Sequence, residues 1–197
     1  IATSASAAEA QLSECAVLPR DATGRLTYKK LQMAIAADIN NIGTGEPEAS
    51  HYMQRLDSWL NAMMNLDCVT DDWRLSAATA ALDGFDQGFA IQPDWSKSLR
   101  NVEVFKKKSG NSPISMALEA EYWIQYAWDA RGTGFSSSVS GDGWKLYRER
   151  MQRAEKLLLD NKARASTVPL WYQQMIVVNT ALGRPKKTRD EIFTEGA

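Results

Sequence analysis

Apolar residues recur along most of this chain at the three- and four-residue spacing that places them on one face of an α-helix. The runs predict about seven or eight helices. They cover residues 28–42, 52–64, 73–88, 95–105, 114–130, 144–158, 171–182 and 187–193. No segment alternates apolar and polar residues over the length of a strand, and β-branched residues are sparse. We therefore predict an all-α fold.

Residues that start and stop helices bound several of these runs. Ser112 is a favourable N-cap, and Pro113 follows at the first helical position, where its missing N–H costs nothing. Pro169 opens a later helix in the same way, and Gly183 closes it. The helix over 114–130 is apolar nearly all round, which predicts that it is buried between neighbouring helices.

Two other helices carry more specific signals. The one over 144–158 has the sharpest amphipathic stripe, which predicts Trp144 in the core, and its charged face places Glu149 and Arg153 in the favourable i,i+4 order for an ion pair. The one over 73–88 has small residues along its stripe, which favour a close crossing by a neighbouring helix. These small residues are Ala77, Ala80, Ala81, Gly84 and Gly88.

The second half of the chain has a rhythm of helix pairs. A proline-started helix is followed by a loop and a second helix, and the same order begins again at Pro169. This order is typical of solenoid repeats, so we predict antiparallel helix pairs stacked as a short tetratricopeptide-like solenoid. In this interpretation residues 1–22 form a leader or extended N-terminal segment, and residues 23–197 form a single helical-repeat domain.

Composition and charge narrow the class of protein. Apolar residues make up 44% of the 197 residues and charged residues 24%, which is ordinary for a globular protein. The 23 basic and 24 acidic side chains leave a net charge of −1, so there is no electrostatic case for a nucleic-acid partner. No apolar run approaches the roughly 20 residues that cross a bilayer, so we predict no integral membrane segment.

The N-terminal residues and the two cysteines bear on the compartment. The small residues that include Ala5 and Ala7 are similar to the tail of a secretory signal, which favours a periplasmic or secreted protein. The alternative is a flexible leader on a cytoplasmic protein. In an exported chain Cys15 and Cys68 predict one disulfide, whereas in the cytoplasm they are small buried hydrophobes. With His51 as the single histidine, no metal site is predicted.

The loop from Arg131 to Gly143 is the strongest candidate for a binding segment, because it is long for a connection between paired helices. Gly132 and Gly134 let the backbone approach another surface, but no strand precedes them and no Gly-Lys-Ser/Thr follows, so they are not a phosphate loop.

Two interpretations of this loop remain open. In the structural one, which we favour, Arg131 caps the last carbonyls of the preceding helix while Phe135 and Val139 plug the core. In the other, Arg131 binds a ligand carboxylate beside a pocket lined by tryptophans. Those tryptophans are Trp128, Trp144 and Trp171.

A sequence pattern from residue 112 to 193 also carries a resemblance. It comprises Ser112-Pro-x-Ser, Ala127-Trp128-x-Ala130-Arg131-Gly132-x-Gly134, Gly143-Trp144 and Pro169-x-Trp171-Tyr172. This pattern resembles a bacterial family known only as a domain of unknown function, whose members look like relatives of tetratricopeptide proteins. The family-like part of the domain is 95–197. The family's pattern continues past the last helix, which is consistent with a truncated or processed product. The resemblance implies a helical fold and transfers no activity and no catalytic residue.

No nucleophile, base or acid pair with a partner emerges from the sequence, so we predict no catalytic residues and no cofactor. The leading hypothesis is a non-enzymatic helical-repeat scaffold that binds another protein, such as an envelope assembly factor or an immunity-type protein. The alternative is a small-molecule binder or enzyme with a pocket beside the loop from Arg131 to Gly143. A closed cavity with convergent polar groups would favour the small-molecule binder or enzyme over the scaffold.

Overall fold

The structure is a computed structural model that describes residues 16–41, 48–65, 83–85, 87–88 and 94–196 of the chain. In these ranges the ordered elements are helices and no residue is in a β-strand, which confirms the predicted all-α class. The chain divides into two compact units, 1–91 and 92–197. The second unit begins close to residue 95, where the family-like part was placed. The leader over 1–22 and the single domain over 23–197 stay predictions.

The first unit contains two well-defined helices, α2 (Tyr28–Asn41) and α3 (Glu48–Asn65), which pack against each other. Their apolar stripes face inward as predicted. The buried residues are Leu31, Ile35, Ala36 and Ile39 on α2 and Met53, Leu56 and Trp59 on α3. Cys15 and Cys68, for which we predicted a disulfide, lie outside the described residues.

A polar pair also joins α2 and α3. Asp38 is 1% exposed, and both of its carboxylate oxygens accept hydrogen bonds from Arg55, one of them at 2.8 Å from Nε. The hydrogen bond to Asp38 raises the pKa of Arg55 above its usual value. The guanidinium also lies over the rings of Tyr52 and Trp59, at 5.3 Å and 5.1 Å from their centroids. A buried carboxylate is thus neutralised by an arginine that is held in place by two rings.

The helix predicted over 73–88 is described only at residues 83–85 and 87–88, which are helical. There the predicted close crossing is confirmed. A Cβ atom added to Gly84 would lie 2.8 Å from Cβ of Ile35, and one added to Gly88 would lie 2.9 Å from Cγ2 of Ile39. The two glycines therefore allow this backbone to rest directly on α2.

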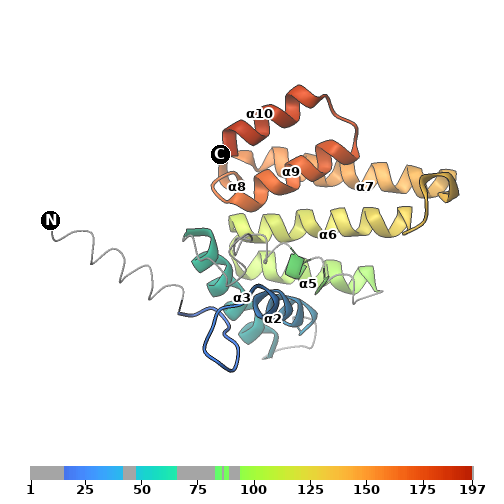
Figure 1. Ribbon diagram of the computed structural model, residues 1–197. Helices are drawn as coiled ribbons and strands as arrows, with labels where there is room; N and C mark the ends of the chain where they lie inside the picture. Colours follow the sequence, from blue (N-terminus) through green and yellow to red (C-terminus); the bar gives the residue numbers. More distant parts are fainter. Residues whose placement is uncertain (1–15, 42–47, 66–82, 86, 89–93, 197) are drawn as a thin grey trace. The chain divides into compact units, whose positions relative to one another are not determined.

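The second unit is built around one long helix, α6 (Pro113–Arg131), which packs mainly against three others. These are α5 (Trp95–Lys108), α7 (Gly141–Asp160) and α9 (Pro169–Ala181). The unit also contains α10 (Lys186–Gly196), which packs on α9, and the short α8 (Lys162–Ala165), which the sequence analysis did not anticipate. Figure 1 shows α6 and α7 side by side as an antiparallel pair.

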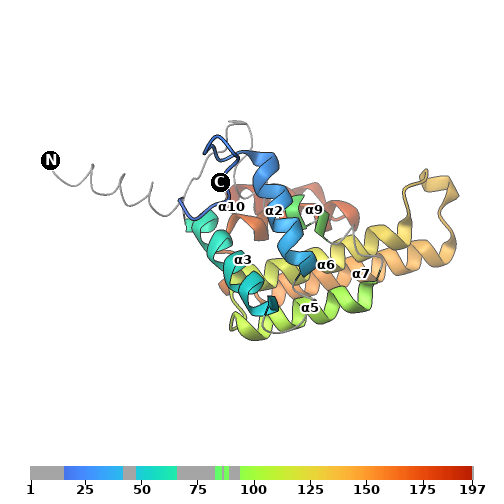
Figure 2. The same cartoon turned by 90° about the horizontal axis from the view of Figure 1, so that it is seen from below.

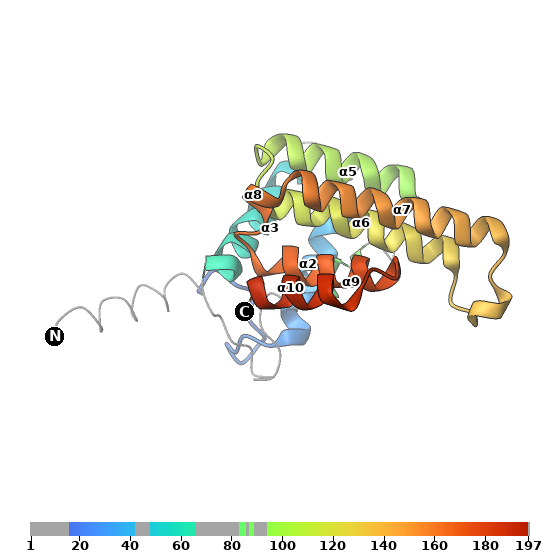
Figure 3. The same cartoon turned by 90° about the horizontal axis from the view of Figure 1, so that it is seen from above.

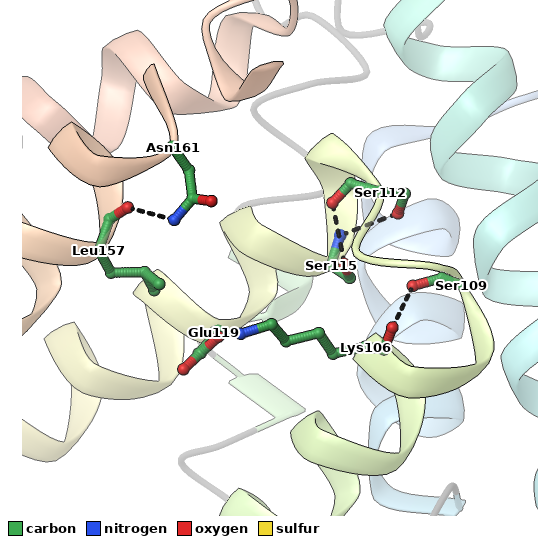
Figure 4. Close-up of polar contacts among 7 residues, drawn as sticks. All are labelled: Lys106, Ser109, Ser112, Ser115, Glu119, Leu157 and Asn161. Atoms are coloured by element: carbon green, nitrogen blue, oxygen red, sulfur yellow. Dashed lines mark hydrogen bonds and ion pairs between the residues drawn. The ribbon is translucent and has the colours of Figure 1, made fainter. Parts of the chain in front are cut away.

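The start of α6 follows the predicted capping pattern. Ser112 is the N-cap, and its Oγ accepts a hydrogen bond of 3.2 Å from the backbone N–H of Ser115 (Figure 4). The preceding helix is tied to the same region because Lys106 Nζ lies 2.6 Å from the Glu119 carboxylate. The predicted burial of α6 on nearly all sides is confirmed over 114–127, whereas Trp128 in its last turn is 39% exposed. Its buried residues are Ile114, Ser115, Met116, Ala117, Leu118, Ala120, Glu121, Tyr122, Trp123, Ile124 and Ala127.

The C-terminal part of the unit is fastened to α7. At the end of α9, Arg184 N–H donates to the carbonyl of Asn179 at 2.8 Å and Gly183 N–H to that of Thr180 at 3.1 Å, so the predicted stop at Gly183 is confirmed. The Arg184 guanidinium then makes two parallel hydrogen bonds to Glu155 of α7, of 2.8 Å and 2.6 Å. This paired contact fixes the turn between α9 and α10 against α7.

The hairpin of α6 and α7 is longer than the helices that flank it. Its loop end projects past α5, α9 and α10 when the structure is seen from the side, from below and from above (Figure 1, Figure 2 and Figure 3). We call residues 128–147, which include the connection between the two helices, the hairpin tip. The connection thus extends beyond the ends of the flanking helices.

Candidate functional site

The hairpin tip is an ordered turn. Helix α6 ends at Arg131, and its C-cap Gly132 has φ 71° and ψ 177°, a conformation that only glycine adopts without strain. Helix α7 begins at Gly141, with Ser140 as the N-cap that accepts from the N–H of Gly143 at 3.0 Å. The connection is therefore residues 132–140, shorter than the predicted loop, because α7 starts three residues before Trp144.

Arg131 organises this turn from within. Its guanidinium lies between two rings, 5.5 Å from the centroid of Trp128 and 5.6 Å from that of Trp144. Its Nη1 donates hydrogen bonds to the carbonyls of Gly132 at 3.0 Å and Gly134 at 3.2 Å. The prediction that Arg131 caps the helix is thus corrected, because its acceptors are carbonyls of the connection. The last helical carbonyls, of Trp128 and Asp129, accept instead from the N–H of Gly132.

The two rings of the tip meet on Tyr147 of α7. Its ring centroid lies 5.1 Å from that of Trp128 and 5.7 Å from that of Trp144, both in edge-to-face arrangements. Tyr147 is 4% exposed, and burial raises its pKa. Trp144 itself is only partly buried, so the prediction of a core tryptophan there is wrong. The core stripe of α7 starts one turn later, at Tyr147.

Phe135 is the most exposed large apolar side chain of the described residues, at 87%. The prediction that it plugs the core is therefore wrong, while Val139 is partly buried. The backbone around Phe135 is nonetheless held in place. Its carbonyl accepts from the N–H of Ser138 at 2.9 Å and from Oγ of the same residue at 2.7 Å. The turn thus displays a phenylalanine on a backbone that is hydrogen-bonded on both sides.

Trp171 does not belong to this site. It is 1% exposed in α9, and its Nε1 donates to the carbonyl of Leu158 at 2.9 Å. Leu158 is 14 residues after Trp144 on α7, about 20 Å along the helix. The structure therefore brings together Trp128, Trp144 and Arg131 and leaves Trp171 in the core. The Arg131 guanidinium lies close to both tip rings, 5.5 Å and 5.6 Å from their centroids.

The chain was compared with known proteins through family models, curated proteins and solved structures. None of the three gave a match. The resemblance over residues 112–193 therefore stays a prediction, and the functional case rests on the geometry of the chain itself.

A surface depression among the described residues lies on α10, far from the predicted loop in the sequence. It has a volume of about 450 Å³ and is lined by side chains from this single helix. All of them are exposed. They are Lys187, Asp190, Glu191, Thr194 and Glu195. An open depression lined by the exposed side chains of one helix is a solvated face, because it does not enclose a ligand as a binding cleft does.

Two further features concern the described part of the chain alone. No group of three or more histidine, cysteine, aspartate or glutamate side chains is placed to hold a metal ion there. His51 is exposed and contacts the ring of Tyr52 edge to face, at 5.7 Å between centroids. Of the helices in these ranges, none has the length and apolar character needed to cross a bilayer.

Sequence analysis missed a second arginine–aromatic cluster, on the flank of the hairpin. Arg150 and Arg153 of α7 lie over the rings of Tyr126 and Trp123 of α6. The ion pair predicted between Glu149 and Arg153 is not formed, since no ion pair of the described residues joins them. The sequence does contain a signal for this cluster. Two aromatic residues lie three positions apart on α6, and two arginines lie three positions apart on α7.

Proposed function

We propose that this chain is a non-enzymatic helical scaffold that binds another protein through the hairpin tip, with Phe135 as the anchor residue. The observation that carries the proposal is the 87% exposure of Phe135 on a turn whose backbone is hydrogen-bonded. Burying a phenylalanine side chain in a partner contributes about 1.5–3 kcal/mol. A large apolar side chain at the end of a projecting hairpin meets a partner before the rest of the unit does.

The rigidity of the tip supports this function energetically. Association costs conformational entropy for every side chain and loop that becomes ordered at the interface. Here Gly132, Arg131 and Ser138 already hold the turn in one conformation. Trp128, which is 39% exposed, adds aromatic surface on the same tip. Aromatic residues and arginine are the residue types that dominate binding energy in protein interfaces.

The wider setting is part of the same proposal. A tetratricopeptide-like stacking of the helix pairs, as the resemblance over 112–193 implies, would place the tip at one edge of a repeat array. A periplasmic or secreted location, with a role as an envelope assembly factor or immunity-type protein, follows from the signal-like residues near Ala5 and Ala7.

A site-specific photocrosslinker tests the proposal in the native cell. The full chain carries benzoylphenylalanine in place of Phe135, and in a matched control in place of Phe193, a second exposed phenylalanine, on α10. The tip position is expected to give one discrete protein adduct that the α10 position does not give. Failure to form any adduct at residue 135 would contradict the proposal.

The captured protein is then purified and its affinity for the chain is measured by calorimetry. Phe135→Ala is expected to weaken binding about 30-fold, as for an anchor residue worth about 2 kcal/mol. The melting temperature should stay that of the parent because Phe135 packs against nothing in the free chain. An affinity that Phe135→Ala leaves unchanged would exclude the tip as the contact, even if the crosslink forms.

A further inference from the structure

A pair of arginines on the flank of the hairpin is oriented by aromatic rings. Cζ of Arg150 lies 3.2 Å from the ring centroid of Tyr126, and Cζ of Arg153 lies 4.0 Å from that of Trp123. Tyr126 in turn stacks on Trp95 of α5, with 4.9 Å between centroids and 27° between planes. Trp123 is 7% exposed, so the Arg153 guanidinium covers its outer side. Both guanidinium planes are thereby fixed before any ligand arrives.

Most of the hydrogen-bond donors of this pair are unused. A guanidinium has five N–H groups. Arg150 uses Nη1 for the carbonyl of Tyr126, whereas Arg153 makes no hydrogen bond to any of the described residues. Arg153 is exposed and Arg150 is partly exposed. Their unused N–H groups are therefore available to a ligand from solvent.

The positive charges of the pair also lack a counterion in the described part of the chain. Neither arginine forms an ion pair there, although Glu149 is adjacent on α7. Glu119 on α6 is bound to Lys106. In contrast, Arg55, whose guanidinium also lies over aromatic rings, is neutralised by buried Asp38. Two like charges one turn apart on a helix destabilise it unless an anion binds them.

We infer that Arg150 and Arg153 form a recognition site for an acidic peptide segment of a partner, which binds along the flank of α7 with one carboxylate on each guanidinium. Residues at i and i+3 of a helix lie about 5–6 Å apart, a separation that neighbouring carboxylates of an extended acidic segment can match. Each contact would be a charge-assisted hydrogen bond, bidentate where the edge of the guanidinium is free. This surface is separate from the hairpin tip, and its test involves neither Phe135 nor the crosslinked protein.

The experiment uses the full chain and a defined probe, an acetylated and amidated hexaglutamate peptide, with hexaglutamine as the uncharged control. Binding is followed at low ionic strength by calorimetry and by the indole Nε1–H signal of Trp123 in two-dimensional NMR. The parent chain is expected to bind hexaglutamate at a single saturable site with a shift of the Trp123 signal, and not to bind hexaglutamine. Arg153→Gln should weaken the binding at least about tenfold.

A matched variant controls for overall charge. Arg148→Gln removes the same charge from the same helix, at an exposed position with no ring contact, and should change the affinity less than about twofold. Arg153→Lys retains the charge and loses the planar donor edge, so an intermediate affinity is expected. Equal weakening by Arg153→Gln and Arg148→Gln would overturn the inference, as would absence of hexaglutamate binding. Displacement of the peptide by an equal concentration of inorganic phosphate would also overturn it, in favour of a small-anion site.

Discussion

Gln174 of α9 donates a hydrogen bond of 3.0 Å from Nε2 to the carboxylate of Glu121 of α6, inside the core of the second unit. The same amide donates to the carbonyl of Ala117 at 2.8 Å, and Gln125 donates to the other carboxylate oxygen at 3.0 Å. Gln174 is 0% exposed and Glu121 3%. A polar contact of this kind between two helices fixes their register, since sliding one helix along the other leaves buried polar atoms without partners.

Replacement of Gln174 by leucine tests the contribution of this contact. Gln174→Leu keeps a similar volume but removes the donor for Glu121 and Ala117, and we expect a loss of about 1–3 kcal/mol in the free energy of unfolding. The loss is offset in part because Oε1 of Gln174 has no hydrogen-bond partner among the described residues. Gln152→Leu, the same change at an exposed position of α7, should stay within about 0.5 kcal/mol of the parent. Urea denaturation of both variants provides the comparison.

Gly84 provides a test of the close crossing in the first unit. A methyl group added there would lie 2.8 Å from Cβ of Ile35, which forces the backbones apart. We expect Gly84→Ala to lower the free energy of unfolding by about 1–3 kcal/mol. Gly141→Ala is the control because a Cβ there meets no atom within 4 Å. Thermal unfolding followed by circular dichroism measures both, and an alanine at residue 84 without effect would rule out direct contact of the two backbones.

The different environments of two tryptophans predict different costs of removal. Trp171 is 1% exposed and hydrogen-bonded to Leu158, so Trp171→Ala should cost about 3–5 kcal/mol. Trp144 is only partly buried at the tip, so Trp144→Ala should cost roughly 1–2 kcal/mol. Denaturant midpoints of the two variants decide the order, and the reverse order would place Trp144 back in the core.

Arg131 is expected to stabilise the tip. Arg131→Ala removes its hydrogen bonds to Gly132 and Gly134 and its contacts with two rings, a loss of roughly 1–2 kcal/mol. Arg131→Lys keeps the charge without the planar donor edge and should fall between alanine and the parent. Melting temperatures together with near-ultraviolet circular dichroism of the tip tryptophans follow the effect. A parent-like melt for Arg131→Ala would mean that the turn holds its shape without this side chain.

Tyr122 predicts a loss of stability in alkaline solution. Burial raises its pKa from 10.0 to about 12, while Arg150 and Arg153 act in the opposite direction. The folded state thus favours the neutral phenol. The contribution of Tyr122 to the free energy of unfolding is therefore complete below pH 10 and is lost as the pH rises to about 12. A shift of two units corresponds to about 2–3 kcal/mol.

The phenylalanine variant isolates this effect. Tyr122→Phe loses the hydrogen bond of 3.0 Å from the Tyr122 hydroxyl to the carbonyl of Trp95 and should cost about 1 kcal/mol at neutral pH. Its stability should then fall less than that of the parent between pH 10 and 12, although Tyr147, whose pKa is also raised, still titrates in both. Urea denaturation across this range gives the comparison, and parallel curves would count against a buried phenol.

Local signals in the sequence were sufficient to locate the helices and their ends. Ser112, Pro113 and Gly183 act through their own backbone conformation and nearest neighbours, and all three lie where the sequence placed them. The small residues that include Gly84 likewise predicted a close helix crossing, although not that α2 is the helix that crosses there. These are properties of a few consecutive residues.

The tip could not be predicted because amphipathicity reports which face of a helix is covered and not how far the covering helices extend. Trp144 lies on the predicted stripe of α7, but it is in the first turn of this helix, at the loop end of the hairpin, which projects past the neighbouring helices (Figure 3). Phe135 is exposed for the same reason. The stacking of Arg150 and Arg153 on α6 depends on the rotation of two helices about their axes, which the spacing within either helix leaves undetermined.

The attachment of α10 has a consequence for the order in which amide hydrogens exchange with solvent. This helix buries a single side chain, Ile192, against the rest of the unit, whereas α6 buries side chains all round. Its other contacts with the unit include the surface ion pair between Lys162 and Glu195 at 2.7 Å, which salt screens. Local opening of α10 therefore has a low free energy, while opening of α6 requires the whole unit to unfold. The second unit is thus graded in stability, from a loosely held last helix to a central helix that opens only on global unfolding.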